Sequence, residues 1–348
     1  MSKLTVVTGA TGHLGNVLVR HMVDRGLAVR ALVQPHDELT ALAGLPVELA
    51  WADVTQPASL EPALEGADVV FHLAGLVSIT RGQRQRLFDV NVGGTRNVVE
   101  ACLRQRVRRL VHVSSVHALT ETQRGSLDET RGFEATSGDY SRSKAEASRL
   151  VRAAAQQGLD AVQVLPTGVL GPWDFRLSEM GQLIAKAGQK GAPVAVGGGY
   201  DWVDVRDVAQ GLLLAAERGR AGEAYLLNGE WLSVKEVLTA VARAAGLAAP
   251  KVTVPLVALW PVALMASLVE GLTHRRALLT PYALRQLASK ARVDDGKARR
   301  ELGYTSRPIE TSVADAWAFL ATHPSSPLKR SMVVQPGRAG VSSAPAAR

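Results

Sequence analysis

The residues Leu4-Thr5-Val6-Val7-Thr8-Gly9-Ala10-Thr11-Gly12-His13-Leu14-Gly15 decide the fold. A mostly apolar, β-favouring run leads into a glycine-rich turn, and an apolar-periodic segment that predicts a helix over 12–25 follows. Gly9, Gly12 and Gly15 form a Gly-x-x-Gly-x-x-Gly pattern, a variant of the dinucleotide-binding fingerprint. Without a Cβ the backbone can turn tightly and approach a pyrophosphate, which the N–H groups of a helix N-terminus attract. The order of strand, turn and helix therefore favours a cofactor site over an ordinary turn.

Strand and helix signals continue to alternate as far as residue 170, which predicts a parallel sheet with helices on both faces. The predicted strands are 4–8, 28–33, 47–51, 69–73, 110–114 and 162–166, and the predicted helices between them are 12–25, 57–64, 93–105 and 140–157. After Gly171 the pattern becomes irregular, with helices predicted at 205–217, 234–245, 281–291, 294–302 and 311–320 and a short strand at 225–227. We expect an α/β protein with a Rossmann-type doubly wound sheet of about seven strands. Its parts are a dinucleotide-binding domain over 1–170, to which later segments return, a smaller and mainly helical substrate lobe over 171–322, and a disordered tail over 323–348.

Composition narrows the class of protein. Hydrophobic residues make up 47% and aromatic residues 5% of the 348, which suits an aliphatic α/β core. The net charge of +8 invites a nucleic-acid partner, but there is no interleaving of basic and aromatic residues and no helix-turn-helix pattern, so none is expected. Cys102 is alone, which excludes an intrachain disulfide, and no Cys/His cluster has metal-ligand spacing. Met1-Ser2-Lys3 runs directly into the first strand, so the cytoplasm is the expected compartment.

The segment 252–269 raises the question of a membrane. It holds 18 residues without a charge, close to the roughly 20 that span a bilayer, but Pro255 and Pro261 interrupt it and Arg275 and Arg276 follow. A buried or pocket-lining helix is the preferred interpretation. Docking on a membrane surface comes second and a true span third.

A second group of residues points to proton transfer. Tyr140 and Lys144 are four apart in a predicted helix and so share a face, and an ammonium near a phenol lowers its pKa. Ser114 and Ser115 end a β run 25 residues before Tyr140, at the carboxyl edge of the sheet where open α/β folds bind ligands. A serine hydroxyl there can hold a substrate oxygen while Tyr140 transfers the proton.

Together these motifs resemble the extended short-chain dehydrogenases/reductases, in the branch of dihydroflavonol-reductase-like, 3β-hydroxysteroid-dehydrogenase-like and sugar-epimerase-like proteins. The resemblance extends to about residue 320 and also rests on 53–54, 72–75, 91–95, 166–172 and 203–208. It implies that Ser115 orients the substrate oxygen, that Tyr140 is the acid/base, and that Lys144 binds the nicotinamide ribose and tunes Tyr140. It further implies that Asn91 supports the active-site helix, for which a helix cap is the alternative, and that the protein forms a homodimer.

The resemblance also implies the residues that hold the nicotinamide dinucleotide. They are Gly9, Thr11, Gly12, His13, Leu14 and Gly15 at the pyrophosphate turn, Gln34 near the 2′ position, Asp53 and Val54 at the adenine, Ala74 and Gly75 at the ribose, and Pro166 and Val169 at the nicotinamide, with Tyr140 and Lys144. NADP-binding relatives often carry Arg where this chain has Gln34, and NAD-binding ones often carry Asp. Because Gln34 is neutral, the cofactor is NAD or NADP, with a slight preference for NAD.

Three residues are candidates for substrate contact, namely His117, Trp173 and Tyr200. For His117 a packed loop position is the preferred alternative, and for the two aromatic residues core packing is an equal one. Dehydratases of this superfamily place an Asp-Glu pair after the catalytic Thr, whereas Val116 and His117 follow Ser115 here, so dehydration is disfavoured.

The expected function is NAD(P)-dependent interconversion of a secondary alcohol and a ketone on a small molecule. The uncharged segment 252–269 favours a hydrophobic substrate that is sterol-, terpenoid- or flavonoid-like. The alternative is a nucleotide-sugar epimerase with tightly bound NAD, which needs a pyrophosphate-binding arginine such as Arg206, Arg275 or Arg285. A non-catalytic dinucleotide sensor or scaffold is the remote third possibility, since Tyr140 and Lys144 are both present.

Overall fold

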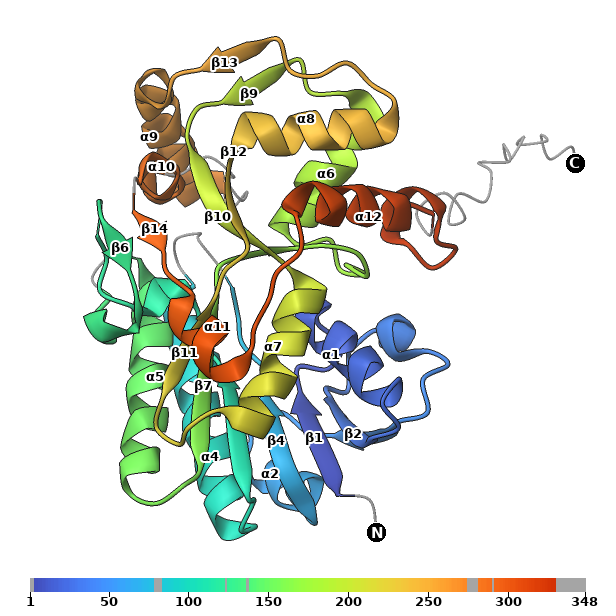
Figure 1. Ribbon diagram of the computed structural model, residues 1–348, viewed down its shortest axis with the longest axis vertical. Helices are drawn as coiled ribbons and strands as arrows, with labels where there is room; N and C mark the ends of the chain where they lie inside the picture. Colours follow the sequence, from blue (N-terminus) through green and yellow to red (C-terminus); the bar gives the residue numbers. More distant parts are fainter. Residues whose placement is uncertain are drawn as a thin grey trace, which may run out of the picture.

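The computed structural model describes residues 3–77, 83–122, 124–135, 138–273, 281–289 and 291–329. In them a seven-stranded parallel sheet has the order β11-β7-β5-β4-β1-β2-β3 (Figure 1). The strands are β1 Leu4–Thr8, β2 Ala28–Val33, β3 Glu48–Trp51, β4 Ala67–His72, β5 Arg109–Val113, β7 Ala161–Pro166 and β11 Ala224–Leu227. The strand order reverses between β1 and β4, which opens a crevice at the carboxyl edge of the sheet. The predicted doubly wound Rossmann-type sheet is confirmed.

Helices cover both faces of this sheet because each presents one apolar stripe to it. On one face α1 (His13–Val23) and α7 (Val205–Arg218) pack against the strands through fully buried side chains such as Leu18 and Leu212. The other face is covered by α2 Pro57–Leu64, α4 Gly94–Arg104 and α5 Asp139–Gln156. Segments 205–227 thus return to the sheet after the chain has left it at β7.

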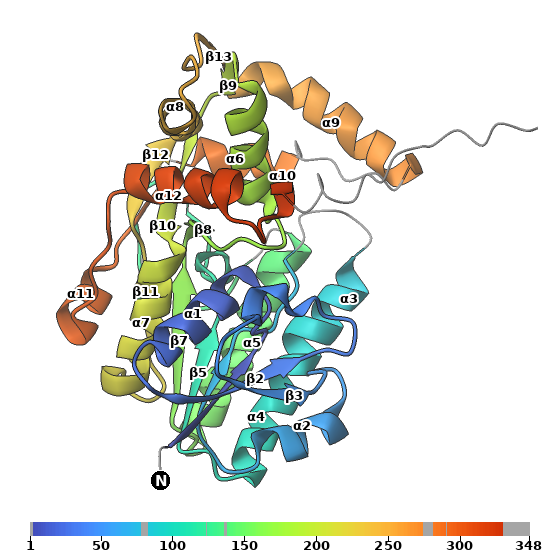
Figure 2. The same cartoon turned by 90° about the vertical axis from the view of Figure 1, so that its right-hand side faces the viewer.

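A smaller lobe lies above the carboxyl edge of the sheet (Figure 2). Its sheets are β8-β10-β12 (Gly168–Leu170, Gly199–Asp204 and Glu230–Ser233) and β9-β13 (Val194–Val196 and Val252–Val254). Its helices are α6 Glu179–Lys190, α8 Val234–Ala245, α9 Leu256–Thr273, α10 Pro281–Ala288 and α12 Ile309–Thr322. The remaining described elements are β6 Ser126–Leu127, β14 Arg292–Val293, α11 Gly296–Leu302, α3 Arg84–Phe88, η1 Leu39–Leu42, η2 Asp89–Gly93, η3 Val116–Ala118 and η4 Glu129–Arg131.

The tail and the segment 252–269 differ from expectation. Residues 323–329, expected to be disordered, make an ordered turn in which the buried Ser326 donates to Leu320 O (2.9 Å), and residues 330–348 lie outside the described ranges. The segment 252–269 forms β13 and most of α9, but the preferred prediction of a buried helix is wrong for its outer face, where Val257 is 77% exposed. None of the helices in the described ranges is both long and apolar enough to cross a bilayer.

Candidate active site

The glycine-rich turn is as tight as the fingerprint requires. Gly9 has φ +68°, and a Cβ there would lie 2.8 Å from Ala74 N at the end of β4. A Cβ on Gly15 would lie 2.1 Å from Gly9 O. Gly12 is the N-cap of α1 and has no side chain to occupy the free N–H groups of the first turn. The turn therefore leaves an open, positively polarised helix N-terminus that fits the pyrophosphate of a dinucleotide.

Beside this turn, three polar side chains form a closed cluster. Thr11 Oγ1 donates to Asp37 Oδ2 (2.9 Å), and Arg176 Nη2 lies 2.8 Å from Thr11 Oγ1 and 2.7 Å from Asp37 Oδ1. Gln34 N, just after β2, also donates to Asp37 Oδ2 (3.1 Å). Burial raises the pKa of Asp37, but the hydrogen bonds from Gln34, Arg176 and Thr11 outweigh it and hold that pKa below its ordinary value. A carboxylate thus lies next to the turn at the end of β2.

Residues 172–173 rest on the start of α1. His13 Nε2 lies 2.9 Å from Pro172 O, and Asn16 Nδ2 donates to Trp173 O (3.1 Å). Trp173 has φ +68°, and its ring packs beneath Arg20 (4.3 Å) and beside Phe319 (5.3 Å), at the junction of the two parts of the molecule. The Trp173 ring packs against the core of the small lobe, as the core-packing alternative predicts, and Trp173 is not among the residues that line the pocket described below.

Ser115, Tyr140 and Lys144 meet at the carboxyl end of β5. The Ser115 and Tyr140 side chains lie close enough to interact, and Ser115 Oγ accepts from His117 N (3.2 Å). Lys144 is buried, one helical turn after Tyr140, and its Nζ donates to Val113 O (2.7 Å). The carboxyl end of β5 and the N-terminal part of α5 thus bring together the three residues that the sequence analysis selected.

Burial dominates the protonation of this group. It lowers the pKa of Lys144 to about 8 and raises that of Tyr140, while the Ser115 hydrogen bond lowers the Tyr140 value in part. The expectation that Lys144 depresses the pKa of Tyr140 is therefore not met by this arrangement, in which the ammonium is bonded to Val113 O. Tyr140 is a neutral phenol here, able to donate a proton.

Asn91 connects the active-site helix to the loop after β4. It lies in the π-helical turn η2, accepts from Leu76 N (2.7 Å) and donates to Leu76 O (3.0 Å) and to Ser143 Oγ of α5 (2.9 Å). A Cβ on Gly75 would lie 3.3 Å from Asn91 Oδ1 and 3.7 Å from Lys144 Nζ. Gly75 therefore leaves space beside the Lys144 ammonium, and Asn91 supports α5 rather than capping a helix.

The other cofactor candidates lie along the same edge. Asp53 Oδ1 accepts from Thr55 N and Oγ1 (both 2.8 Å), so this oxygen is engaged in its own turn. Val54 is buried against Gly94 at the start of α4. Pro166 ends β7, and Val169 lies in β8 beside Val203 of β10. Leu14 packs partly buried against the core of the first face.

A pocket opens next to Ser115, between η3, β10, β12 and α10. Its lining includes the apolar side chains Val116, Leu119, Leu127, Trp231, Ala291 and Val293. His117 and Tyr200 lie in its wall, joined by a 2.7 Å hydrogen bond between Nε2 and the phenol oxygen, with their rings stacked at 5.8 Å. Burial lowers the pKa of His117 to about 4, so its ring is neutral at pH 7. Two of the three substrate candidates thus line one pocket.

Several residues of the site escaped the sequence reasoning. Asp201 and Trp231 line the pocket, and Arg176 and Asp37 flank the phosphate turn. An acidic residue about 20 positions after the fingerprint was a usable signal for Asp37. No comparable pattern precedes Arg176 or Trp231, which tertiary packing alone brings into place.

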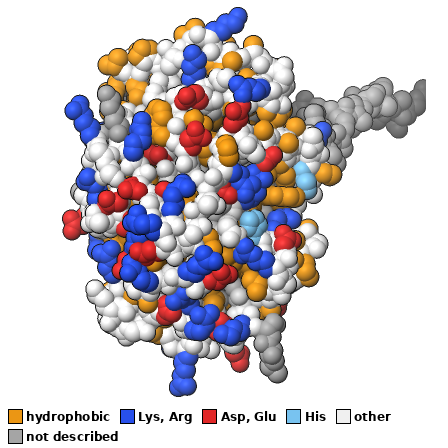
Figure 3. All heavy atoms as spheres, in the orientation of Figure 1, with side chains coloured by type: hydrophobic (Ala, Val, Ile, Leu, Met, Phe, Trp, Pro, Cys, Tyr) orange, Lys and Arg blue, Asp and Glu red, His pale blue; other side chains and the backbone are white. Residues whose placement is uncertain are grey.

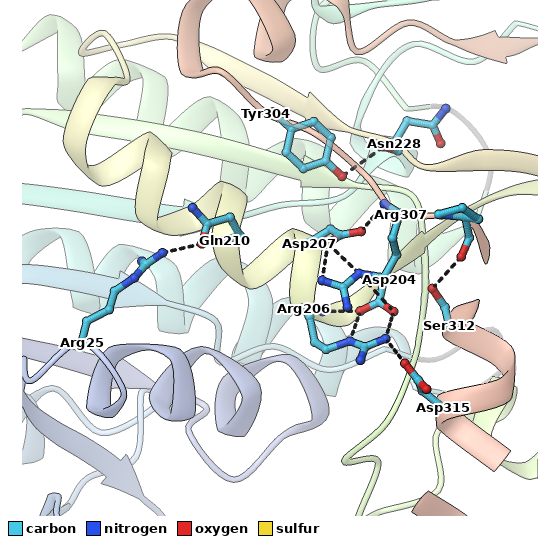
Figure 4. A network of polar contacts seen from close by, with 11 residues as sticks. Arg25, Asp204, Arg206, Asp207, Gln210, Asn228, Tyr304, Arg307, Ser312 and Asp315 are labelled. Carbon is cyan, nitrogen blue, oxygen red and sulfur yellow. Dashed lines mark hydrogen bonds and ion pairs between the residues drawn. The ribbon is translucent and has the colours of Figure 1, made fainter. Parts of the chain in front are cut away.

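Arg206, at the start of α7, is committed to ion pairs (Figure 4). Its Nη2 lies 2.7 Å from both Asp204 Oδ2 and Asp315 Oδ2. Arg307 pairs with Asp207 (2.8 Å) in the same network. Arg285 lies on α10 beside Trp260, and Arg275 falls outside the described residues. Arg206 is therefore a structural cation rather than an available anion receptor.

The model of the NAD dependent epimerase/dehydratase family matches residues 5–227, which include the phosphate turn and the Ser115, Tyr140 and Lys144 group. The chain belongs to this family. The resemblance to extended short-chain dehydrogenases/reductases is thereby confirmed, and the protein is an NAD(P)-dependent enzyme of that type.

Relatives span nearly the whole chain. Sterol demethylase protein B of Methylococcus capsulatus is 38% identical over 320 residues, 90% of this chain and 97% of its own length. A 4-hydroxy-2-methyl-3-oxo-4-farnesyl-3,4-dihydroquinoline-1-oxide ketoreductase of Stigmatella aurantiaca is 33% identical over 90% of this chain and 95% of its own. The crystal structure of gox2253 superposes with a TM-score of 0.81 at 33% identity, over 93% of this chain and 100% of the other. The family fold thus extends through the small lobe.

Proposed function

We propose that this family member interconverts a secondary alcohol and a ketone on a hydrophobic, ring-containing small molecule. The observation that carries the proposal is the approach of the Ser115 and Tyr140 side chains, one helical turn from the buried Lys144 and next to the pocket residues Val116 and His117. A pair of hydroxyls beside a pocket can hold one oxygen of a substrate molecule.

The reaction divides between the chain and its cofactor. A nicotinamide held at this site would supply the hydride chemistry. Ser115 holds the substrate oxygen. Tyr140 donates its phenol proton during reduction, and the tyrosinate that this leaves takes the hydroxyl proton back during oxidation. Lys144, with its Nζ next to the space left by Gly75, holds the nicotinamide ribose and supplies a positive charge beside the forming phenolate.

The pocket wall supports a hydrophobic substrate. Val116, Leu127 and Trp231 line it together with polar residues that include Glu121 and Asp201, and His117 is neutral and hydrogen-bonded to Tyr200. The names of two relatives point the same way, since one is a sterol demethylase protein and the other reduces a farnesylated quinoline. A sterol-like or terpenoid substrate agrees with both the wall and the names.

A nucleotide-sugar epimerase would need an arginine to bind the pyrophosphate of its substrate, and neither of the two candidate arginines that the structure describes is placed for that role. Arg206 is held by Asp204 and Asp315, and Arg285 lies against Trp260 on α10. Freeing Arg206 would leave the fully buried Asp204 without that partner. The oxidoreductase is therefore the function we propose.

Tyr140→Phe tests the proposed chemistry. We expect kcat to fall by about 100-fold or more on a panel of 3β-hydroxysteroids and hydrophobic ketones, because general acid/base transfer contributes at least that much. The affinity for NADH, measured by fluorescence titration, should stay within about twofold. Tyr200→Phe, which removes another pocket hydroxyl, is the matched control and should mainly change KM. A Tyr140→Phe enzyme within tenfold of the parent would refute the assigned acid/base.

We further propose that NAD is the preferred cofactor and that Asp37, rather than Gln34, sets the preference. Asp37 follows Gly15 by 22 residues, and its carboxylate is held at the end of β2 by Gln34 N and Thr11. A carboxylate at this place accepts hydrogen bonds from the ribose hydroxyls and repels a 2′-phosphate. Arg176 screens that charge from the other side.

Asp37→Asn is expected to shift the ratio of the NADPH to the NADH dissociation constant toward NADPH by about tenfold. The carboxylate's repulsion disappears while the Arg176 guanidinium remains to attract the 2′-phosphate. Glu38→Gln removes the same charge one residue further along and should leave the ratio unchanged. An unchanged ratio in Asp37→Asn would show that the 2′ position lies elsewhere.

A further inference from the structure

The outer face of α9 is apolar and exposed. Val257 is 77%, Val262 53%, Leu264 54% and Met265 61% exposed. Their spacing places them on one side of the helix, together with the exposed Pro261. Water-facing helices of soluble proteins carry polar residues on this side.

The inner face of the same helix is also apolar, so α9 is hydrophobic all round. Ala263 is fully buried, and Leu256 approaches the space beside Gly198 in the small lobe. The exposed surface continues onto the neighbouring β9-β13 pair, where Val252 is 55% and Val194 48% exposed. An apolar surface of this extent, formed by adjacent elements, marks an interaction site rather than scattered single residues.

Cations flank this surface. Residues 252–269 contain no Asp, Glu, Lys or Arg, and Glu270 is the first acidic residue of α9. Exposed Lys251 directly precedes β13, exposed Lys190 ends α6, and the guanidinium of exposed Arg285 lies 6.0 Å from the Trp260 ring on α9. Figure 3 shows lysine and arginine side chains spread over the face of the molecule that it presents, among hydrophobic and acidic ones. The chain as a whole carries +8.

We propose that α9 docks the protein flat on an anionic lipid surface. Apolar side chains flanked by lysine and arginine are the pattern of helices that lie in the interface between headgroups and acyl chains. A span is not required, since no helix of the described ranges is suited to one. A second copy fits less well, because a stable dimer interface takes about 20–30 residues a side and would oppose two sets of cations.

The position of α9 near the pocket suggests that docking serves substrate entry, an idea that rests on the proposed function. Gln286 of α10 and Ser289, just after it, line the pocket, and Arg285 of α10 lies against α9. A hydrophobic substrate dissolved in the bilayer would then enter the pocket from the side that contacts the lipid. Docking itself does not depend on turnover, so the two ideas are tested separately.

Vesicle flotation tests the docking. The full-length protein is mixed with vesicles of equal parts phosphatidylcholine and phosphatidylglycerol, or of phosphatidylcholine alone. We expect it to float with the anionic vesicles and to be released by high salt in part. The double variant Leu264→Glu with Met265→Glu should lower the partition coefficient about tenfold or more, because two carboxylates would enter the apolar boundary.

Leu103→Glu is the matched control, since Leu103 is 46% exposed on α4, away from the small lobe. It should float like the parent. Light scattering reports the oligomeric state of each protein, and thermal melting reports folding. The proposal would be overturned if the unmodified protein and the double variant floated equally. It would also be overturned if neither bound vesicles and the unmodified protein were a dimer while the double variant was a monomer. Turnover of a water-soluble ketone is measured in parallel, so that failure of the proposed function is seen independently.

Discussion

His72 and His112 face each other on β4 and β5, yet only one of them has hydrogen-bond partners. His72 Nδ1 lies 2.9 Å from Thr8 Oγ1, and its Nε2 lies 3.0 Å from Thr95 Oγ1. His112 pairs with it in register, with ring centroids 5.3 Å apart, but neither of its buried ring nitrogens has a hydrogen-bond partner. Burial lowers the pKa of His72 to about 3 and that of His112 well below its ordinary value. Both rings are therefore neutral core residues.

Replacing His112 with leucine should stabilise the protein by about 1–2 kcal/mol at pH 7. The substitution removes buried polar atoms that lack partners and keeps a similar volume. His72→Leu is the matched control and should destabilise the protein by a similar amount, because it removes two hydrogen bonds. Urea unfolding of the three proteins checks this, and a destabilised His112→Leu would contradict it.

At the scale of single residues, the sequence predicted the site residues that belong to a motif. It did not predict the residues that only the tertiary fold brings to the site. Ser115 and Tyr140 could be predicted as neighbours because a strand end and a helix start meet at one edge of the sheet. Arg176 contacts Asp37, which lies 139 positions away in the sequence, and no sequence pattern predicts that contact. For Trp173 the sequence left substrate contact and core packing equally open, and in the structure its ring packs under Arg20.

At the scale of elements, α7 begins at a charged junction with α12. Asp204 caps α7 by accepting from Arg206 N (2.7 Å), and the same carboxylate binds the Arg206 guanidinium. Asp204 is fully buried, whereas the side chain of Asp315 on α12 is 42% exposed. The two carboxylates therefore hold the same guanidinium under different solvation.

Asp204→Ala should cost about 3–5 kcal/mol in unfolding free energy, because it leaves a partly buried arginine without its inner partner and removes a helix cap. Asp315→Ala should cost less than about 1 kcal/mol, since an exposed ion pair is screened by water. Chemical denaturation of both variants gives the comparison. Equal losses would show that burial does not govern this network.

Helices and strands could be predicted from the sequence where their buried residues recur in a regular pattern. Most strands of the large sheet are buried apolar runs, although the edge strand β3 is largely exposed. Their predicted limits agree with the observed ones within about two residues. The strands of the small lobe are only three to six residues long and partly exposed, so they left no pattern. α6 was missed because its glycines lower helix propensity. Gly188 is there to admit Trp317, which would lie 2.3 Å from a Cβ.

At the scale of the whole molecule, buried titratable groups set the acid stability. Burial lowers the pKa values of His72, His112 and His117, so the folded protein keeps these rings neutral where the unfolded chain protonates them. Their contribution is complete above the unfolded value near 6.5 and is lost as pH falls toward the folded values. Asp201 acts in the opposite direction, because burial raises its pKa to about 6.

Between pH 5.5 and 4.5 the unfolding free energy should fall by about 3 kcal/mol per pH unit, which corresponds to about two protons taken up on unfolding. Asp201→Asn removes the opposing group and should make the fall steeper by about 1 kcal/mol per unit. Denaturation series at several pH values measure both slopes. A flat profile for the parent protein would mean that the histidines are protonated in the folded state.

The chain leaves the large sheet for the small lobe over residues 171–178, and it does so across the phosphate turn. Pro172, Trp173 and Arg176 contact His13, Asn16 and Thr11, respectively. A dinucleotide bound at that turn would therefore stabilise the segment that leads into the lobe with the substrate pocket. The kinetic consequence is a compulsory order, in which the coenzyme binds first and leaves last.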